Sequence, residues 1–408
     1  MMDNSTQSSQ TAHASPPINR RRFLTQLGVA TLVLVSGAGV YRAFDRGVFS
    51  TATGPAFEPW EHWRTEPATG AMRLLQSAIL AANPHNTQPW LFRIENNRID
   101  VFADFSRHLG TMDPWRRELY IGLGCAIENM LQTARSEGMD VTVELDQGRL
   151  SLDAEGMKHA ATLLLRPSSP LNSPLHEAIP FRHTDRSVYR DDPIAGELID
   201  SLLLLNDNPD ISLFTFTRGQ DSHTRLSEAT VAATEFIIAD RQMSHDSHRW
   251  FDKNWEELQR DRDGPFIDTS GSSPMIRAVV KMMPPMPDRM IDQGWLSNTK
   301  NSVITSPLLG FITVKDLYSQ EQSIQAGQLW QRMHLWATTR NLSMQPINQL
   351  PEQVDRERQL GMENSTARWL SALIGTASWQ PTFVFRMGYP ASRVFASARR
   401  ALNDVLMS

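Results

Sequence analysis

Hydrophobic residues in the first part of the chain follow both helical and strand periods, which predicts a mixed α and β fold. An alanine-rich apolar run at 74–82 predicts a helix, and the Asn-Pro pair that follows ends it, because the residue before proline is pushed out of the α region. A longer helix is expected at 118–136, with Pro114 near its start and Gly138 just past its end. Alternating or continuous apolar runs predict strands at 91–94, 99–103, 141–145 and 160–165.

A Pro-Ser-Ser-Pro sequence at 167–170 indicates a linker between two unequal parts, 57–170 and 174–408. The second part contains a coarse repeat of the first, since sliding 124–139 onto 327–342 brings most apolar positions into register. The aligned pairs include Met130 with Met333 and Ala134 with Ala337. Two amphipathic helices often align by chance. The match also fits a tandem duplication in which each half carries one long central helix.

Residues 222–300 form an extra region of the second part, rich in tryptophan and methionine. His245 and His248 have a spacing that suits a metal, and methionine clusters can hold copper. We expect no metal, because both histidines lie in a charged run at 241–249 that is typical of a solvated helix face. Adaptable methionines and tryptophans instead favour a lid over an apolar surface.

Composition excludes several classes of protein. The 408 residues are 40% hydrophobic and 21% charged, within the range of ordinary globular proteins. The net charge of −5 gives no basis for nucleic-acid binding by bulk electrostatics. Cys125 is the single cysteine, which excludes an intramolecular disulfide and a cysteine-based metal cluster.

The segment 1–47 is expected to lie outside the fold, as a disordered polar start followed by an export signal. Arg20 and Arg21 precede Phe23-Leu24 and an apolar stretch at 27–41, an order that resembles a twin-arginine signal. The alternative is a basic, membrane-proximal anchor. The resemblance implies the twin-arginine translocase as a partner and a periplasmic location. No clean Ala-x-Ala cleavage site follows the apolar stretch, so an uncleaved segment that tethers the protein to the outer face of the inner membrane stands beside a cleaved one as an alternative.

Residues 83–90 read Asn-Pro-His-Asn-Thr-Gln-Pro-Trp, a polar turn between a helix and a strand. Such amides serve ordinary capped loops as well as ligand sites. The segment resembles the Ser-x-x-Asn-x-Gln-Pro-Trp motif of the FMN-dependent nitroreductase family, and its wording is closest to the Acg-like branch. In that family the segment lies against the flavin ring. The resemblance therefore implies flavin contacts from Asn83, His85, Asn86 and Gln88.

A second stretch, 181–189, resembles the arginine-rich opening motif of the same family. FMN requires cations and neutral donors around its phosphate. The resemblance implies phosphate and ribityl contacts from Arg182, His183, Thr184 and Arg186, although Arg186-Ser187 could instead take the place of the motif's Arg-Ser pair.

The end of the chain resembles the family's terminal Gly-Tyr-Pro strand and its Arg-Arg-Pro-Leu tail, with alanine in place of the proline. In the family a basic residue of this tail reaches the phosphate. Arg399 and Arg400 are therefore candidates, with Arg399 preferred. By itself a terminal arginine pair would more often be a solvated tail.

The reacting edge of the flavin is expected at 341–349, the loop after the second central helix. Its Pro-Ile-Asn version is Acg-like, and the resemblance places Gln345, Pro346, Ile347 and Asn348 over the ring. The hydride chemistry belongs to the cofactor, so no protein residue is assigned a catalytic role.

Together these features predict an α+β fold of the nitroreductase type, built from two tandem, diverged halves that form an internal pseudo-dimer with a lid insertion. Such a chain needs no partner subunit, so we expect a monomer holding FMN between its halves. The expected function is two-electron transfer from a reduced donor, such as NAD(P)H, to a nitroaromatic or quinone acceptor. The alternative is a catalytically silent protein that stores FMN under a closed lid. Flavin-consuming chemistry, which the family includes, is a third reading.

Overall fold

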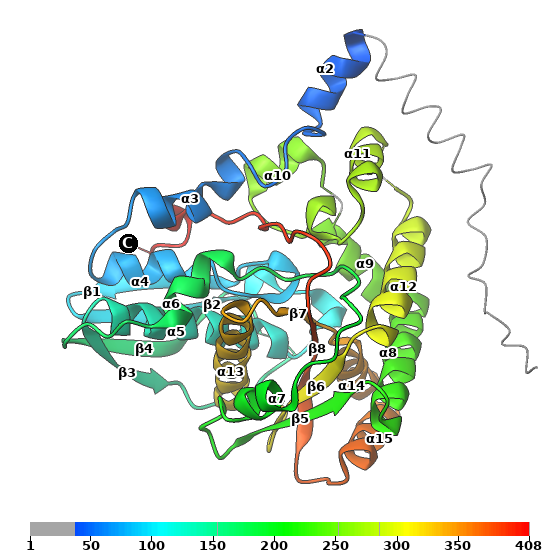
Figure 1. Cartoon of the computed structure of the whole chain (residues 1–408). Coiled ribbons are helices and arrows are strands. Elements are labelled where there is room, and N and C mark those ends of the chain that lie inside the picture. Colours follow the sequence, from blue (N-terminus) through cyan, green and yellow to red (C-terminus); the bar gives the residue numbers. More distant parts are fainter. Residues whose placement is uncertain (1–36, 153, 252, 285, 408) are drawn as a thin grey trace, which may run out of the picture.

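The structure of the protein is a computed structural model that describes residues 37–407, apart from residues 153, 252 and 285 (Figure 1). The proposed twin-arginine pair and most of the apolar stretch that follows it lie outside the described residues. The first described element is the helix α2, Gly37–Asp45. Within the described part of the chain, every helix is too short or too polar to cross a membrane.

Each half of the chain contributes one four-stranded antiparallel sheet (Figure 1). The first sheet has the order β1-β2-β4-β3, with β1 Trp90–Glu95, β2 Arg98–Asp104, β3 Met139–Leu145 and β4 Met157–Pro167. The second has the order β5-β6-β8-β7, with β5 Ile211–Thr217, β6 Leu308–Val314, β7 Ser343–Pro346 and β8 Gln380–Gly388. The predicted strands and the α+β class are confirmed. The strand order is the same in both sheets, and equivalent strand pairs carry a register shift, which fits a tandem duplication.

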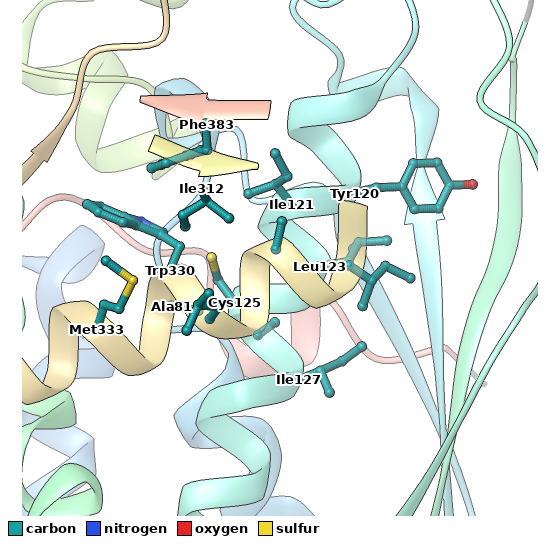
Figure 2. Packing of buried hydrophobic residues seen from close by; sticks show 14 of the residues in the cluster. Ala81, Tyr120, Ile121, Leu123, Cys125, Ile127, Ile312, Trp330, Met333 and Phe383 are labelled. Atoms are coloured by element: carbon teal, nitrogen blue, oxygen red, sulfur yellow. The ribbon is translucent and has the colours of Figure 1, made fainter. Parts of the chain in front are cut away.

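Two long helices, α5 (Arg117–Ser136) and α13 (Gln320–Thr338), cross at the centre of the molecule (Figure 2). A Cβ atom on Gly124 would lie 1.9 Å from the carbonyl oxygen of Ile324, and one on Gly327 would lie 2.0 Å from that of Ile121. The offset that relates the two glycines also relates the two isoleucines. The crossing is therefore reciprocal, as in a two-fold interface, and glycine is required on both sides because only it permits this approach.

The C-terminal tail of the second half also packs against the first sheet. After β4 the chain crosses to the second sheet, where Tyr189 forms a bridge with Pro390. The C-terminus returns to the first sheet: Phe92 N–H donates to the Val405 carbonyl at 2.8 Å, and Met407 N–H donates to the Phe92 carbonyl at 2.8 Å. One continuous hydrophobic core runs through both halves, and Figure 2 shows its part around Cys125, Trp330 and Phe383. The edge of the first sheet at Phe92 is therefore completed by the C-terminal tail of the second half.

Shorter helices surround this centre. In the two halves they are α3 Glu58–Thr65, α4 Ala71–Ala78, α6 Pro174–Ala178, α7 Gly196–Leu203, α14 Gln349–Gln359 and α15 Ser365–Ile374. The extra region contributes α8 Asp221–Ala239, α9 Arg241–Phe251, α10 Trp255–Asp261, α11 Pro274–Met282 and α12 Asp288–Ile304.

The prediction that 241–249 presents a solvated face is wrong in part. Met243, Ser244, Ser247 and His248 of α9 are buried. The Nε2 atom of His248 lies 3.0 Å from a carboxylate oxygen of Asp292 on α12, which packs against α9. The polar residues that made the run look solvated are therefore in part an inward-facing network between two helices.

Candidate functional site

A cavity of about 160 Å³ lies where the two halves meet beneath the extra region. The first half lines it with Asn83, Pro84 and His85 of the polar turn and with Glu118, Ile121, Gly122 and Cys125 of α5. The second half contributes Thr184 and Arg186 from its N-terminal segment, and Trp330, Gln345, Pro346, Asn348, Gln349, Glu352 and Phe383. Ser247, Phe251, Pro265 and Trp295 close it from the extra region. Seven of the predicted site residues thus share one cavity.

The polar turn has an unusual backbone. His85, Asn86 and Gln88 have φ values of 43°, 54° and 53°, in the left-handed region that non-glycine residues seldom adopt. Each such residue stores roughly 1–3 kcal/mol of strain, and strain of this kind collects at functional sites. The Asn83 side chain holds the turn, because its Oδ1 accepts the Gln88 N–H at 2.8 Å. The turn directs Asn83 and His85 towards the cavity.

Asn86 and Gln88 turn away from the cavity and bind the C-terminal tail. Asn86 donates to the Ala398 carbonyl at 2.9 Å and accepts from Arg399 at 2.5 Å. Gln88 accepts the Arg400 N–H at 2.8 Å. The structure therefore brings together two predicted motifs, the polar turn and the terminal arginines, but it does so through hydrogen bonds between the motifs themselves. Direct flavin contacts from these four residues stay a prediction.

His85 is uncharged near neutral pH. Its Nε2 lies 3.2 Å from the Ser247 hydroxyl, and its ring packs edge-on against Phe251 with centroids 5.2 Å apart. Burial, helped by the positive charge of Arg186, lowers its pKa to about 4. Because Ser247 and Phe251 belong to α9, His85 connects the turn to the extra region that covers the cavity.

Two buried arginines stand behind the turn without a carboxylate partner. Arg182 and Arg399 both donate to the Leu80 carbonyl, at 3.2 and 3.5 Å, and the Nε of each is buried without a hydrogen-bond partner. Among the described residues, no ion pair includes either of them. Burial lowers the pKa of Arg182 to about 10 and that of Arg399 well below its usual value, the latter with help from Arg182. His183 beside them has its pKa lowered to about 3 by burial and by both cations.

Arg186 is held more loosely. Its guanidinium donates to the Thr269 carbonyl at 3.3 Å, and its pKa is lowered to about 10 by burial and by Arg386. Arg386 on β8 is fully buried, donates to Gln345 at 2.6 Å and to the Ser187 carbonyl at 2.7 Å, and lies 3.9 Å from the Tyr189 ring centre. Sequence reasoning missed Arg386, although an arginine inside the apolar run Phe-Val-Phe-Arg-Met was a usable signal.

A second cavity of about 400 Å³ adjoins the first, and Thr184 and Arg186 line both. Its other walls carry two further cations, Arg277 and Arg393, and hydroxyl side chains from the loop that begins α11. The buried Nε of Arg277 has no hydrogen-bond partner among the described residues. The second cavity therefore offers three guanidinium groups around one space, together with the carboxyl groups of Asp185 and Asp268, the second of which lies 3.9 Å from Arg277.

The segment 341–349, predicted as a loop that faces the reacting edge, forms strand β7 at Ser343–Pro346 and then leads into the N-terminus of α14. Gln345, Pro346 and Asn348 line the first cavity, whereas Ile347 is buried and donates its N–H to the Val384 carbonyl at 2.8 Å. Asn348 is fixed from behind, because its Oδ1 accepts the Val384 N–H at 2.9 Å. Sequence reasoning missed Glu118 and Glu352, which bring two buried carboxyl groups to the same cavity.

Comparisons with known proteins reach part of the chain. No family model matches it. Putative NAD(P)H nitroreductase MT3217 and Putative NAD(P)H nitroreductase Rv3131, both of Mycobacterium tuberculosis, are each 31% identical to it over 125 residues. The match covers 30% of this chain and 35% of each relative, so the chain spans about a third of the length of the curated relatives it matches.

Two solved structures are also similar. The FMN-dependent nitroreductase NfnB from Mycobacterium smegmatis, in complex with NADPH, is 15% identical with a TM-score of 0.35, over 57% of this chain and 96% of that one. The FMN and NADPH-dependent nitroreductase NfnB from Sphigopyxis sp. strain HMH is 13% identical with a TM-score of 0.38, over 57% of this chain and 98% of that one. At these identities and scores, neither likeness decides the ligand or the activity of this chain.

Proposed function

We propose that this protein is a nitroreductase-like flavoprotein that binds one FMN between its halves and transfers electrons from NAD(P)H to a nitroaromatic or quinone acceptor. The observation that supports this most is the pair of adjoining cavities, the first lined by apolar, amide and buried carboxyl groups and the second by three guanidinium groups, hydroxyl groups and two carboxyl groups. A bound flavin would supply the hydride chemistry. The names of the curated relatives are consistent with the same activity class.

The residues present fit such a cofactor. Ligand sites usually measure about 300–1,000 Å³, so the first cavity alone is small for a nucleotide, and the two joined cavities reach this range. Trp330, Phe383 and Pro346 would pack against the ring in the first cavity. A phosphate carries close to two negative charges and forms its strongest hydrogen bonds with guanidinium groups. Arg186, Arg277 and Arg393 of the second cavity would meet that need, although Arg277 also pairs with Asp268 at 3.9 Å.

Arg186 is the residue on which the two parts of this site depend. It stands at the wall between the cavities with one hydrogen bond to a carbonyl, so its side chain can turn to a phosphate at little cost. Thr184 would add a hydroxyl beside it. Arg182 and Arg399 contribute differently: their buried, uncompensated charge favours an anion nearby, and their hydrogen bonds to Leu80 and Asn86 hold the polar turn.

One observation favours the second candidate function, a flavin store. Ser247, Phe251, Pro265 and Trp295 of the extra region line the first cavity, so this region would restrict the access of an acceptor to the ring. A store would bind FMN without turnover with any acceptor. The proposed reductase would turn over, and the rate would report how readily the extra region opens.

The test is a titration of the purified full chain with FMN, followed by visible absorbance and flavin fluorescence. We expect saturable binding that is weakened at least tenfold in Arg186→Ala. Arg368→Ala is the matched control, because that side chain is 63% exposed and forms only a surface ion pair with Glu363. Anaerobic NADPH should then bleach the bound flavin, and an added quinone should restore it. Absence of binding would refute the proposal, and binding without reduction or reoxidation would favour the store.

We also propose that the chain is exported by the twin-arginine route, to the periplasm or to the outer face of the inner membrane, and acts there as a monomer. The reciprocal crossing of α5 and α13 supports the second point, since the interface that a dimer would supply is already present inside one chain. Substituting Arg20 and Arg21 by lysine and following the location of the protein tests the first.

A further inference from the structure

Two helices direct acidic side chains at the floor of the first cavity. Glu118 stands in the first turn of α5 and Glu352 in the first turn of α14, and both line the cavity. Each residue is only 5% exposed. One half supplies Glu118 and the other supplies Glu352, so the two carboxyl groups meet only because the halves pack together.

The cluster around them contains more carboxyl groups than cations. Asp113 and Asp355 complete a group of four acids, and Arg117 is the guanidinium within it. The guanidinium group of Arg117 forms an ion pair with a carboxylate oxygen of Asp355 at 2.7 Å, and both side chains are fully buried. Tyr318 donates its hydroxyl to the other oxygen of Asp355 at 2.9 Å. The charge of Arg117 is thus already balanced before either glutamate is counted.

The remaining donors go to Asp113. Its two oxygens accept the N–H groups of Glu118 and Leu119, at 3.1 and 3.0 Å, at the start of α5. By contrast, Oε1 of Glu118 is buried without a hydrogen-bond partner among the described residues. Gln349 Oε1, also on the cavity wall, is in the same condition. A buried carboxylate oxygen without a donor is costly, which favours the protonated form of Glu118 although its side chain also interacts with that of Asn348.

The charged neighbours act in the same direction. The pKa of Glu118 is raised to about 8, by burial first and also by Asp113 and Asp355, whereas Arg117 and the Asn348 side chain act to lower it. The pKa of Glu352 is raised well above its usual value by burial and then by Glu118. On the cavity side the facing groups are His85, Arg186 and Cys125. An acid in a helix's first turn ordinarily serves the helix dipole as an exposed carboxylate, and neither glutamate meets that description.

We propose that Glu118 is the proton donor of this cavity, with Glu352 as the neighbouring acid that resupplies it. This rests on the proposed function. A bound reduced flavin would supply a hydride, that is two electrons and one proton, to a quinone in the cavity, and a second proton would then be required. The O–H bond of Glu118 then breaks, and its proton passes to the quinone oxygen that carries the negative charge. Hydroquinone and the Glu118 carboxylate result. Glu352 returns a proton to Glu118 and is itself reprotonated from solvent.

The experiment compares the full chain with Glu118→Gln and Glu352→Gln, and with Glu363→Gln as control, whose side chain is 77% exposed. Infrared spectra without any substrate should contain a protonated-carboxyl band at pH 7 that loses intensity above about pH 8. In Glu118→Gln the band should be weaker, because only Glu352 remains to contribute, and in the control it should be unchanged. It needs no flavin, so it tests the protonated acid even if FMN binding fails.

The kinetic measurement uses the FMN-loaded protein and a quinone. In Glu118→Gln, reoxidation by quinone should slow about 100-fold or more and lose its fall at high pH, while reduction by NADPH stays unchanged. Glu352→Gln should retain the first turnover and slow the later ones. A wild-type spectrum without the protonated band at pH 7 would overturn the proposal. So would a Glu118→Gln variant that reoxidises at the wild-type rate with the wild-type pH profile.

Discussion

The crossing of α5 and α13 gives the most quantitative prediction. In Gly327→Ala, the new methyl group would lie 2.0 Å from the Ile121 carbonyl oxygen, well inside contact distance, and the backbone of a central helix cannot yield as a side-chain end can. Forcing the helices apart should cost about 3 kcal/mol, the upper end for overpacked cores. Alanine's better helix propensity returns about 1 kcal/mol, so the net loss is about 2 kcal/mol.

The control is Gly294→Ala in α12, where an added Cβ meets nothing within 4 Å. That change should stabilise the protein by up to about 1 kcal/mol, because propensity acts alone. Urea unfolding followed by tryptophan fluorescence measures both. Gly124→Ala should match Gly327→Ala, since its contact with Ile324 is the reciprocal one. If the Gly327 variant were as stable as the Gly294 variant, the close crossing and the pseudo-symmetry argued from it would be refuted.

Two further predictions concern buried charge. Because the pKa values of His85 and His183 are lowered in the folded state, the unfolded chain binds more protons below about pH 6.5. The stability of the protein should therefore decrease as the pH is lowered from about 6.5, by up to about 1.4 kcal/mol per pH unit for each histidine. Urea unfolding midpoints at pH 7 and pH 5 measure this decrease. His183→Gln should flatten this decline, and an unchanged slope would contradict the assignment. Asp355→Ala strands the buried Arg117 and should cost about 3–5 kcal/mol, whereas Asp316→Ala, which breaks an exposed pair, should cost less than about 1 kcal/mol in the same assay.

Local patterns predicted the strands and the long helices, because period and punctuation are properties of neighbouring residues. The alignment of Gly124 with Gly327 also led to a real feature, since a duplicated helix keeps the residue that its crossing requires. The direction of each side chain in the polar turn was harder to foresee. It depends on the left-handed backbone of His85, Asn86 and Gln88, which no residue type in that turn demands.

The carboxyl cluster could not be predicted from the sequence. Glu118 and Glu352 are remote in the chain and meet only through the packing of α5, α14 and the second sheet. His248 illustrates the same limit: its charged neighbours indicated a solvated face, and its contact with Asp292 depends on how α12 lies against α9. In both cases the chemistry follows from tertiary contacts rather than from spacing.

The central claim, one flavin held between two halves of one chain, is tested most directly by native mass spectrometry of the full chain with FMN. The account predicts a single chain carrying one FMN, and loss of that species in Arg186→Ala but not in Arg368→Ala. A chain that retains no FMN, or a species in which two chains share their flavins, would contradict it.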